Sequence, residues 1–166
     1  MTIAEKFEVF LLEFQDMVYA TALRLLGNPA EAEDVAQTVF LKAFERFGDL
    51  DGNPSAPGWL KTVATNECLN HLARYRTRWS FFAQPTENPG PWTQSDPGPE
   101  HDYQALDLAL RRLPASQRVP IVLFHFDELS YQQIADRLKV SLSKVKTDIH
   151  RGREALRAAL MQGSRR

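Results

Sequence analysis

A proline-rich segment, residues 79–102, constrains the fold of this 166-residue chain more than any other feature. It has the sequence WSFFAQPTENPGPWTQSDPGPEHD, with five prolines and two glycines. Proline lacks a backbone donor and has a fixed φ, so this density excludes a continuous helix or a central strand. A structureless loop of this length is uncommon inside one compact domain. We therefore expect a linker between a first domain at 1–78 and a second at 103–166.

The residues before the linker show helical periodicity. Apolar side chains recur at spacings of three and four, which predicts helices over about 14–26, 29–47 and 59–76. Gly27 is expected to end the first helix, and Asn28 to cap the second, with Glu31 placed for a capping box. Residues 48–58 are expected to form a loop. No segment shows sustained period-two alternation, so the predicted fold is all-α: two small helical domains.

The stretch SYQQIADRLKVSLSKVKTDIHRGREAL, residues 130–156, predicts two short helices around a tight turn. Ser130 can cap the first helix, and Gln133 stands where a capping box requires Gln or Glu. Ser141 is the next plausible N-cap. Each helix carries one apolar stripe, formed by Ile134, Ala135 and Leu138 and by Val145, Ile149, Leu156 and Leu160. The pattern indicates a helix-turn-helix.

The second of these helices is rich in side chains that bind bases and phosphates. They are Ser141, Ser143, Lys144, Lys146, Thr147, His150, Arg151 and Arg153. A recognition helix needs hydrogen bonds for base edges and cations for phosphates on the face opposite its apolar stripe. The alternative is a surface hairpin with a solvated basic face. Asp148 would repel phosphate there, although it could accept from a cytosine amino group. We favour binding to double-stranded DNA.

The charge distribution supports this assignment better than the net charge of −1 does. Residues 111–166 hold 12 Lys and Arg against 5 Asp and Glu, whereas residues 1–110 hold 8 against 16. A basic C-terminal part joined to an acidic body predicts nucleic acid as one partner and a different partner for the other part.

Composition excludes several other functions. Cys68 is alone, so no intrachain disulfide can form, and a cytoplasmic protein is expected. No apolar run could span a bilayer, and Glu5, Lys6 and Glu8 interrupt any signal peptide, so no membrane insertion is expected. The four histidines are scattered without ligand spacing, and no nucleotide-binding or nucleophile motif occurs. We therefore expect no enzyme, cofactor or metal.

Two long segments together resemble the extracytoplasmic-function sigma factors of bacterial RNA polymerase. AEAEDVAQTVFLKAFERF (30–47) and GWLKTVATNECLNHLARYRTR (58–78) are similar to the family's promoter-melting domain. Residues 104–162, including LRRLPASQRVPIVLFHFDELSYQQIADRL, are similar to its second DNA-binding domain. The resemblance covers nearly the whole chain in the right order. It implies an initiation factor that joins core RNA polymerase, recognises two promoter elements and helps to melt the minus-ten element.

The resemblance assigns a role to each group of residues. Core polymerase would bind Asp34, Gln37, Phe40 and Lys42, although Phe40 also lies on the predicted core stripe. The melted minus-ten strand would bind Asn66, Asn70, Arg74, Arg76 and Arg78. The upstream minus-thirty-five element would bind the helix-turn-helix. An anti-sigma factor is implied as a further partner.

The chain departs from the family pattern at several positions. Asn70 stands where an aspartate is usual, Lys139 replaces a common turn glycine, and Asp148 a common basic residue. Pro120 would remove a helical hydrogen bond, so a late start or a kink is expected there. Two alternatives stay open: an autonomous dimeric helix-turn-helix regulator, and a sigma-like decoy that binds an anti-sigma factor and never contacts promoters.

Overall fold

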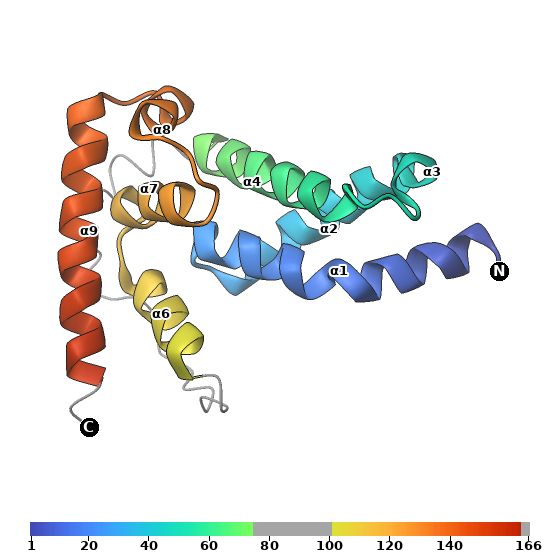
Figure 1. Ribbon diagram of the computed structural model, residues 1–166, viewed down its shortest axis with the longest axis horizontal. Coiled ribbons are helices and arrows are strands. Elements are labelled where there is room, and N and C mark those ends of the chain that lie inside the picture. Colours follow the sequence, from blue (N-terminus) through green and yellow to red (C-terminus); the bar gives the residue numbers. More distant parts are fainter. Residues whose placement is uncertain (75–100, 164–166) are drawn as a thin grey trace. The chain divides into compact units, whose positions relative to one another are not determined.

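The computed structural model describes residues 1–74 and 101–163, and the chain forms two compact units, residues 1–75 and 76–166 (Figure 1). All regular secondary structure in the described ranges is helical. The all-α expectation is thereby confirmed. Arg76 and Arg78, and the proline-rich segment up to residue 100, lie outside the described residues.

The first unit contains α1 (Ile3–Leu26), α2 (Pro29–Glu45), the short α3 (Phe47–Leu50) and α4 (Ala56–Arg74). Helices α1, α2 and α4 each pack against the other two. The faces that meet carry the apolar stripes seen in the sequence. The fully buried side chains are Val18, Ala22, Leu25, Ala32, Val39, Ala43, Leu60, Ala64 and Cys68. Cys68 is thus a small core side chain rather than an accessible thiol.

The turn between α1 and α2 follows the predicted capping chemistry with one correction. Gly27 ends α1 in the left-handed region at φ 68°, a conformation that glycine adopts without a Cβ penalty. The side chain of Asn28 accepts a hydrogen bond from the Glu31 amide at 3.1 Å. The expected capping box is only half formed, because the Glu31 carboxylate pairs instead with Nε2 of His71 on α4, at 3.1 Å.

The region predicted as a loop, 48–58, is more ordered than expected. Most of α3 lies inside it, and α4 begins at Ala56 rather than near Trp59. Asn53 organises the connection, since its side chain donates to the Asp49 carbonyl at 3.1 Å and accepts from the Ser55 amide at 2.9 Å. These local hydrogen bonds from a side chain satisfy backbone groups of the connection. A pattern of apolar residues does not reveal such bonds.

The second unit contains α6 (His101–Arg112), α7 (Ala115–His125), α8 (Tyr131–Leu138) and α9 (Leu142–Gly163). Helix α9 packs against all three of the others. The core of this unit includes Leu110, Val119, Ile121, Leu123, Ile134, Ala135, Val145 and Ile149. The predicted apolar stripe of α9 is therefore buried as far as Leu156, whereas Leu160 is 38% exposed.

Helix α7 contains Pro120 and begins at Ala115, so the expected late start is wrong, and the kink expected as the other possibility stays a prediction. The buried Arg118 supports the start of this helix, because its guanidinium donates to the Leu113 carbonyl at 2.9 Å. Pro120 itself is buried, so its ring adds apolar contacts where a helical hydrogen bond is lost.

The predicted helix-turn-helix is confirmed in α8 and α9. Ser130 and Gln133 form a complete capping box, with hydrogen bonds of 3.1 and 2.8 Å. Lys139 caps the C-terminal end of α8 in the left-handed region, at φ 58° and ψ 46°. The turn thus keeps the geometry that glycine usually supplies, although a lysine must adopt it.

Candidate functional site

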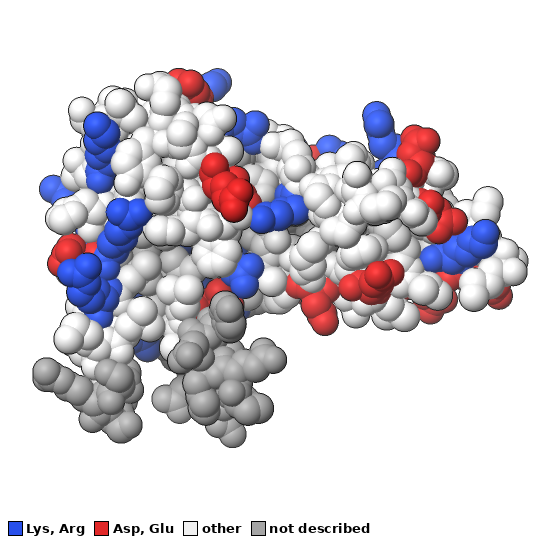
Figure 2. Space-filling model, viewed as in Figure 1, with Lys and Arg blue, Asp and Glu red and all other residues white. Residues whose placement is uncertain are grey.

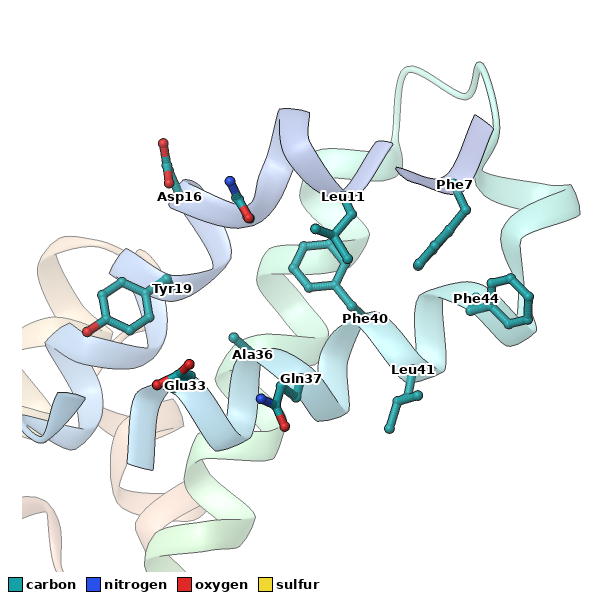
Figure 3. Close-up of a pocket in the computed structure, with 11 residues that line it drawn as sticks. Phe7, Leu11, Asp16, Tyr19, Glu33, Ala36, Gln37, Phe40, Leu41 and Phe44 are labelled. Atoms are coloured by element: carbon teal, nitrogen blue, oxygen red, sulfur yellow. The ribbon is translucent and has the colours of Figure 1, made fainter. Parts of the chain in front are cut away.

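A groove runs between α1 and α2 on the surface of the first unit, with a volume of about 860 Å³ (Figure 3). Leu11 from α1 and Phe40 from α2 are among the residues that line it. Its wall is mostly apolar, with acidic and amide groups at one side. The lining residues are Phe7, Leu11, Gln15, Asp16, Tyr19, Glu33, Ala36, Gln37, Phe40, Leu41 and Phe44.

One end of the groove is built from phenylalanine rings. The Phe7 ring makes edge-to-face contacts with Phe44 and Phe47, at centroid distances of 5.0 and 5.3 Å. Such pairs favour a fixed arrangement of the rings. Phe44 nevertheless stays 52% exposed, and Leu41 beside it is 68% exposed. Large apolar side chains left this open at the edge of a groove are typical of a surface that binds a partner.

The residues expected to bind core polymerase fall into two groups. Gln37 and Phe40 line the groove, and Asp34 lies on the same side of α2, three residues before Gln37. Asp34 and Gln37 are exposed, whereas Phe40 is only 7% exposed and mainly fills the core. Lys42 is on the opposite side, where its ammonium pairs with Glu67 of α4.

Sequence reasoning missed Leu41 and Phe44 as site residues. Leu41 follows Gln37 by four residues, and Phe44 follows Leu41 by three, so both continue the stripe that begins at Asp34. That spacing was visible in the sequence. An apolar residue at this spacing is equally compatible with a core position, and only the packing of α1 and α2 shows that these two stay exposed.

An ion pair and a hydrogen bond tie the far side of α2 to α4. Lys42 forms an ion pair with Glu67, and the Glu31 carboxylate lies 3.1 Å from Nε2 of His71, within hydrogen-bond distance. They lie eleven residues apart along α2, so they hold both ends of the helix. The groove on the other side of α2 is thus carried by a helix with a fixed orientation.

Helix α4 presents a polar stripe. Asn66, Asn70 and Arg74 are spaced four residues apart and so share one face, on which Asn70 and Arg74 are exposed and Asn66 is partly buried. Trp59 lies at the start of the same face and is half-buried, so part of its ring surface is open. Amides, a cation and an aromatic ring in a row can bind single-stranded nucleic acid.

The first turns of α9 expose a polar and basic face. The Oγ of Ser141 caps the helix by accepting from the Lys144 amide at 3.1 Å. Ser143, Lys146, Thr147, His150 and Arg151 are all exposed, while Val145 and Ile149 on the opposite face are buried. On the side seen in Figure 2, Lys and Arg side chains follow α9, and Asp and Glu are more frequent over the first unit.

Gly152 lets α9 approach α7 closely, a feature that sequence reasoning missed. A Cβ at this position would lie 2.3 Å from Cδ1 of Ile121 and 3.3 Å from Cβ of Gln117. The only available signal was a glycine at the position where the apolar stripe of Val145 and Ile149 continues.

Arg153, expected to contact DNA, faces α7 instead. Its guanidinium lies 5.4 Å from the centre of the Phe124 ring and within 3.2 Å of Nε2 of His125. Burial, and after it the adjacent Arg153 charge, lowers the pKa of His125 below its ordinary value of 6.5. A neutral His125 can accept a hydrogen bond from Arg153, so this cluster supports the packing of α9.

Lys144 and Asp148, one turn apart on α9, form an ion pair with a distance of 2.6 Å between Nζ and Oδ2. Both line a polar pocket of about 500 Å³ between α6, α7 and α9, together with Arg112 and Arg151. Asp148 therefore has a cationic partner within its own helix.

Within residues 1–74 and 101–163, no group of three or more His, Cys, Asp or Glu side chains is arranged to hold a metal ion. In the same ranges, no helix is both long enough and apolar enough to cross a membrane.

Comparison with known families assigns both units. Residues 10–78 match the family described as sigma-70 region 2, and residues 103–156 match sigma-70, region 4. The ECF RNA polymerase sigma factor SigW of Bacillus subtilis is 34% identical over 158 residues, which cover 89% of this chain and 84% of SigW. The chain belongs to the ECF sigma factor family. The resemblance seen in the sequence is confirmed.

A second relative and a solved structure agree with this assignment. The ECF RNA polymerase sigma factor SigE of Mycolicibacterium smegmatis is 36% identical over 90% of this sigma factor, which spans 59% of that longer relative. The sigma factor RpoE of Bartonella quintana, solved in complex with the anti-sigma factor NepR, matches with a TM-score of 0.53. The match covers 93% of this sigma factor and 96% of that chain, at 24% identity, which shows the shared fold.

Proposed function

We propose that this sigma factor binds core RNA polymerase through the groove between α1 and α2, and then recognises and melts promoter DNA. The observation that carries the proposal is the groove itself: an open apolar surface with an acidic side, continuous with Asp34 and Gln37. Its relatives SigW and SigE are named as RNA polymerase sigma factors, which supports the same partner here.

The groove fits a partner helix with both apolar and basic side chains. Full burial of one large apolar side chain contributes about 1.5–3 kcal/mol, and Leu41 and Phe44 are both exposed enough to gain from it. Asp16 and Glu33 on the wall would attract basic residues and accelerate association. Core polymerase would thus dock by burying the apolar groove, and added salt would weaken the acidic contribution.

Promoter DNA would then meet two separate surfaces. The stripe of Asn66, Asn70 and Arg74 on α4 suits the melted minus-ten strand, and the half-buried Trp59 on the same face would stack on an unpaired base. The exposed face of α9 suits the major groove of the minus-thirty-five element. Arg76 and Arg78 extend the α4 stripe in sequence and remain predicted contacts to the melted strand.

An anti-sigma factor would regulate this activity by occupying the same groove. RpoE of Bartonella quintana is described in complex with an anti-sigma factor, which supports this class of partner. Core polymerase and an anti-sigma factor could not occupy the groove at the same time, so the two partners would compete for it.

Reconstituted transcription tests the proposal. The variants L41D and F44D place a carboxylate on the groove, and V9D is the matched control, because Val9 is 55% exposed on α1 but does not line the groove. With sigma-free core polymerase and a promoter library, we expect the wild type and V9D to initiate transcription, and each groove variant to lose co-purification with core.

Three results would contradict the proposal. Binding of palindromic duplex DNA without core polymerase, together with no core-dependent initiation, would indicate an autonomous regulator. Retained binding to an anti-sigma factor with neither core binding nor DNA binding would indicate a sigma-like decoy. Equal loss of core binding in V9D and L41D would show that charge on this unit, rather than the groove, determines assembly.

A further inference from the structure

We propose that Asp148 limits the DNA affinity of α9 by holding the Lys144 ammonium away from the phosphate backbone. This inference rests on the proposed function, because it concerns the same recognition helix. It gives a role to the carboxylate that is the least expected side chain on a helix that binds DNA.

The position of Lys144 makes its ammonium valuable for DNA binding. It lies in the first turn of α9, three residues after the cap Ser141, and the N-terminal residues of a recognition helix are those that enter the major groove. A lysine there would normally reach a phosphate. In this structure Lys144 turns along the helix instead, and its Nζ donates to Asp148 at 2.6 Å.

The surroundings of Asp148 make this ion pair more persistent than an exposed pair. The Asp148 side chain is only 13% exposed, whereas that of Lys144 is 47% exposed. A partly buried carboxylate is screened less by salt and keeps a cation beside it. Arg112 and Arg151 line the same pocket, so Asp148 carries the negative charge of an otherwise basic site.

The exposed face of α9 is correspondingly less basic than the sequence suggests. Ser143, Thr147 and His150 are exposed on the outer face, and Lys146 is exposed beside them. Lys144 lies on the side of the helix toward the polar pocket. Asp148 therefore competes with DNA phosphate for one cation, and the helix depends more on hydrogen bonds than on charge.

The salt dependence of DNA binding measures the number of cations that contact phosphate. Each neutralised phosphate adds about 0.9 to the slope of log affinity against log salt concentration. The test uses the full-length protein and a random-sequence DNA duplex, because phosphate contacts are independent of sequence. Binding of the wild type, D148N, K144M and the double variant D148N/K144M would be titrated between 50 and 200 mM salt.

We expect D148N to bind the duplex more tightly than the wild type and to steepen the slope by about 0.9. Its gain in affinity over the wild type should therefore be about 3.5-fold smaller at 200 mM than at 50 mM salt. K144M alone should change affinity less than twofold. The double variant should bind like K144M, because loss of the Asp148 charge can release an ammonium only when Lys144 is present. K146M is the matched control and should lower the slope by about 0.9 with or without Asp148.

The outcomes separate the two proposals. If D148N gains as much affinity in the K144M background as in the wild type, Asp148 acts by general repulsion and the inference is wrong. The inference is also wrong if D148N binds no more tightly than the wild type while K146M still weakens binding. If neither the wild type nor D148N binds the duplex at 50 mM salt, the inference is wrong, because a released Lys144 then adds no phosphate contact. The proposed function would still stand, because it requires DNA binding only after core polymerase has docked.

Discussion

Replacing Gly152 with alanine should loosen the contact between α9 and α7. The new Cβ would lie 2.3 Å from Cδ1 of Ile121, more than 1 Å closer than carbon atoms pack, about 3.5–4.0 Å. Ile121 is only 3% exposed, so its side chain cannot swing into solvent. Overpacking costs about 1–3 kcal/mol, and the alanine returns about 1 kcal/mol of helix propensity. We expect a net loss of roughly 1 kcal/mol.

Hydrogen exchange of the α7 and α9 amides is the appropriate assay, because the chain has two units and need not unfold in one transition. G58A is the matched control: Gly58 lies near the start of α4, and no atom lies within 4 Å of a Cβ built there. G58A should increase the hydrogen-exchange protection of α4 by up to about 1 kcal/mol and leave the protection of α9 unchanged.

A second variant isolates the steric cause. I121V removes the clashing Cδ1 and by itself should cost about 0.5–1.5 kcal/mol. The double variant G152A/I121V should cost less than the two single changes together, because the contact that each disturbs is shared. If G152A increases protection in α9 as G58A does in α4, or if the two changes are additive, the close approach does not constrain α9.

The cluster around Arg153 gives two further predictions. R153M should destabilise the second unit by about 0.5–1 kcal/mol, the size of an exposed cation–π contact with Phe124. It should leave the salt slope of duplex binding unchanged, and a slope lowered by about 0.9 would instead place Arg153 on phosphate. The lowered pKa of His125 should make the unit less stable in acid. The unfolded chain binds a proton that the folded chain does not, so stability falls as the pH drops from about 6.5 toward the lowered pKa. Thermal unfolding of H125N should not show this loss of stability as the pH drops. An equal loss of stability in H125N would assign the effect to another titrating group.

Much of this fold could be predicted from the sequence because its signals are local. The apolar stripes predicted the helices, and the box of Ser130 and Gln133 placed the start of α8 correctly. The same rule was only half right at Asn28, because the Glu31 carboxylate has a better partner in His71, forty residues away. Local rules fail where a distant side chain competes for the same group.

The candidate site was predicted less completely than the fold. Asp34 and Gln37 were selected and are exposed, and their role in core binding stays a prediction, whereas Leu41 and Phe44 were not selected, since apolar residues usually lie in the core. The pair of Lys144 and Asp148 could have been found, because oppositely charged residues four apart on a helix commonly meet.

By itself, the sequence determined that this chain forms two helical units, where α2, α8 and α9 begin, and which family it resembles. These follow from periodicity, caps and motifs, which depend on residues within a few turns of each other. Only the tertiary structure decided which apolar residues stay exposed in the groove, why Gly152 must be small, and that Arg153 faces α7. Those properties depend on which surfaces meet, and packing between distant segments has no local signature in the chain.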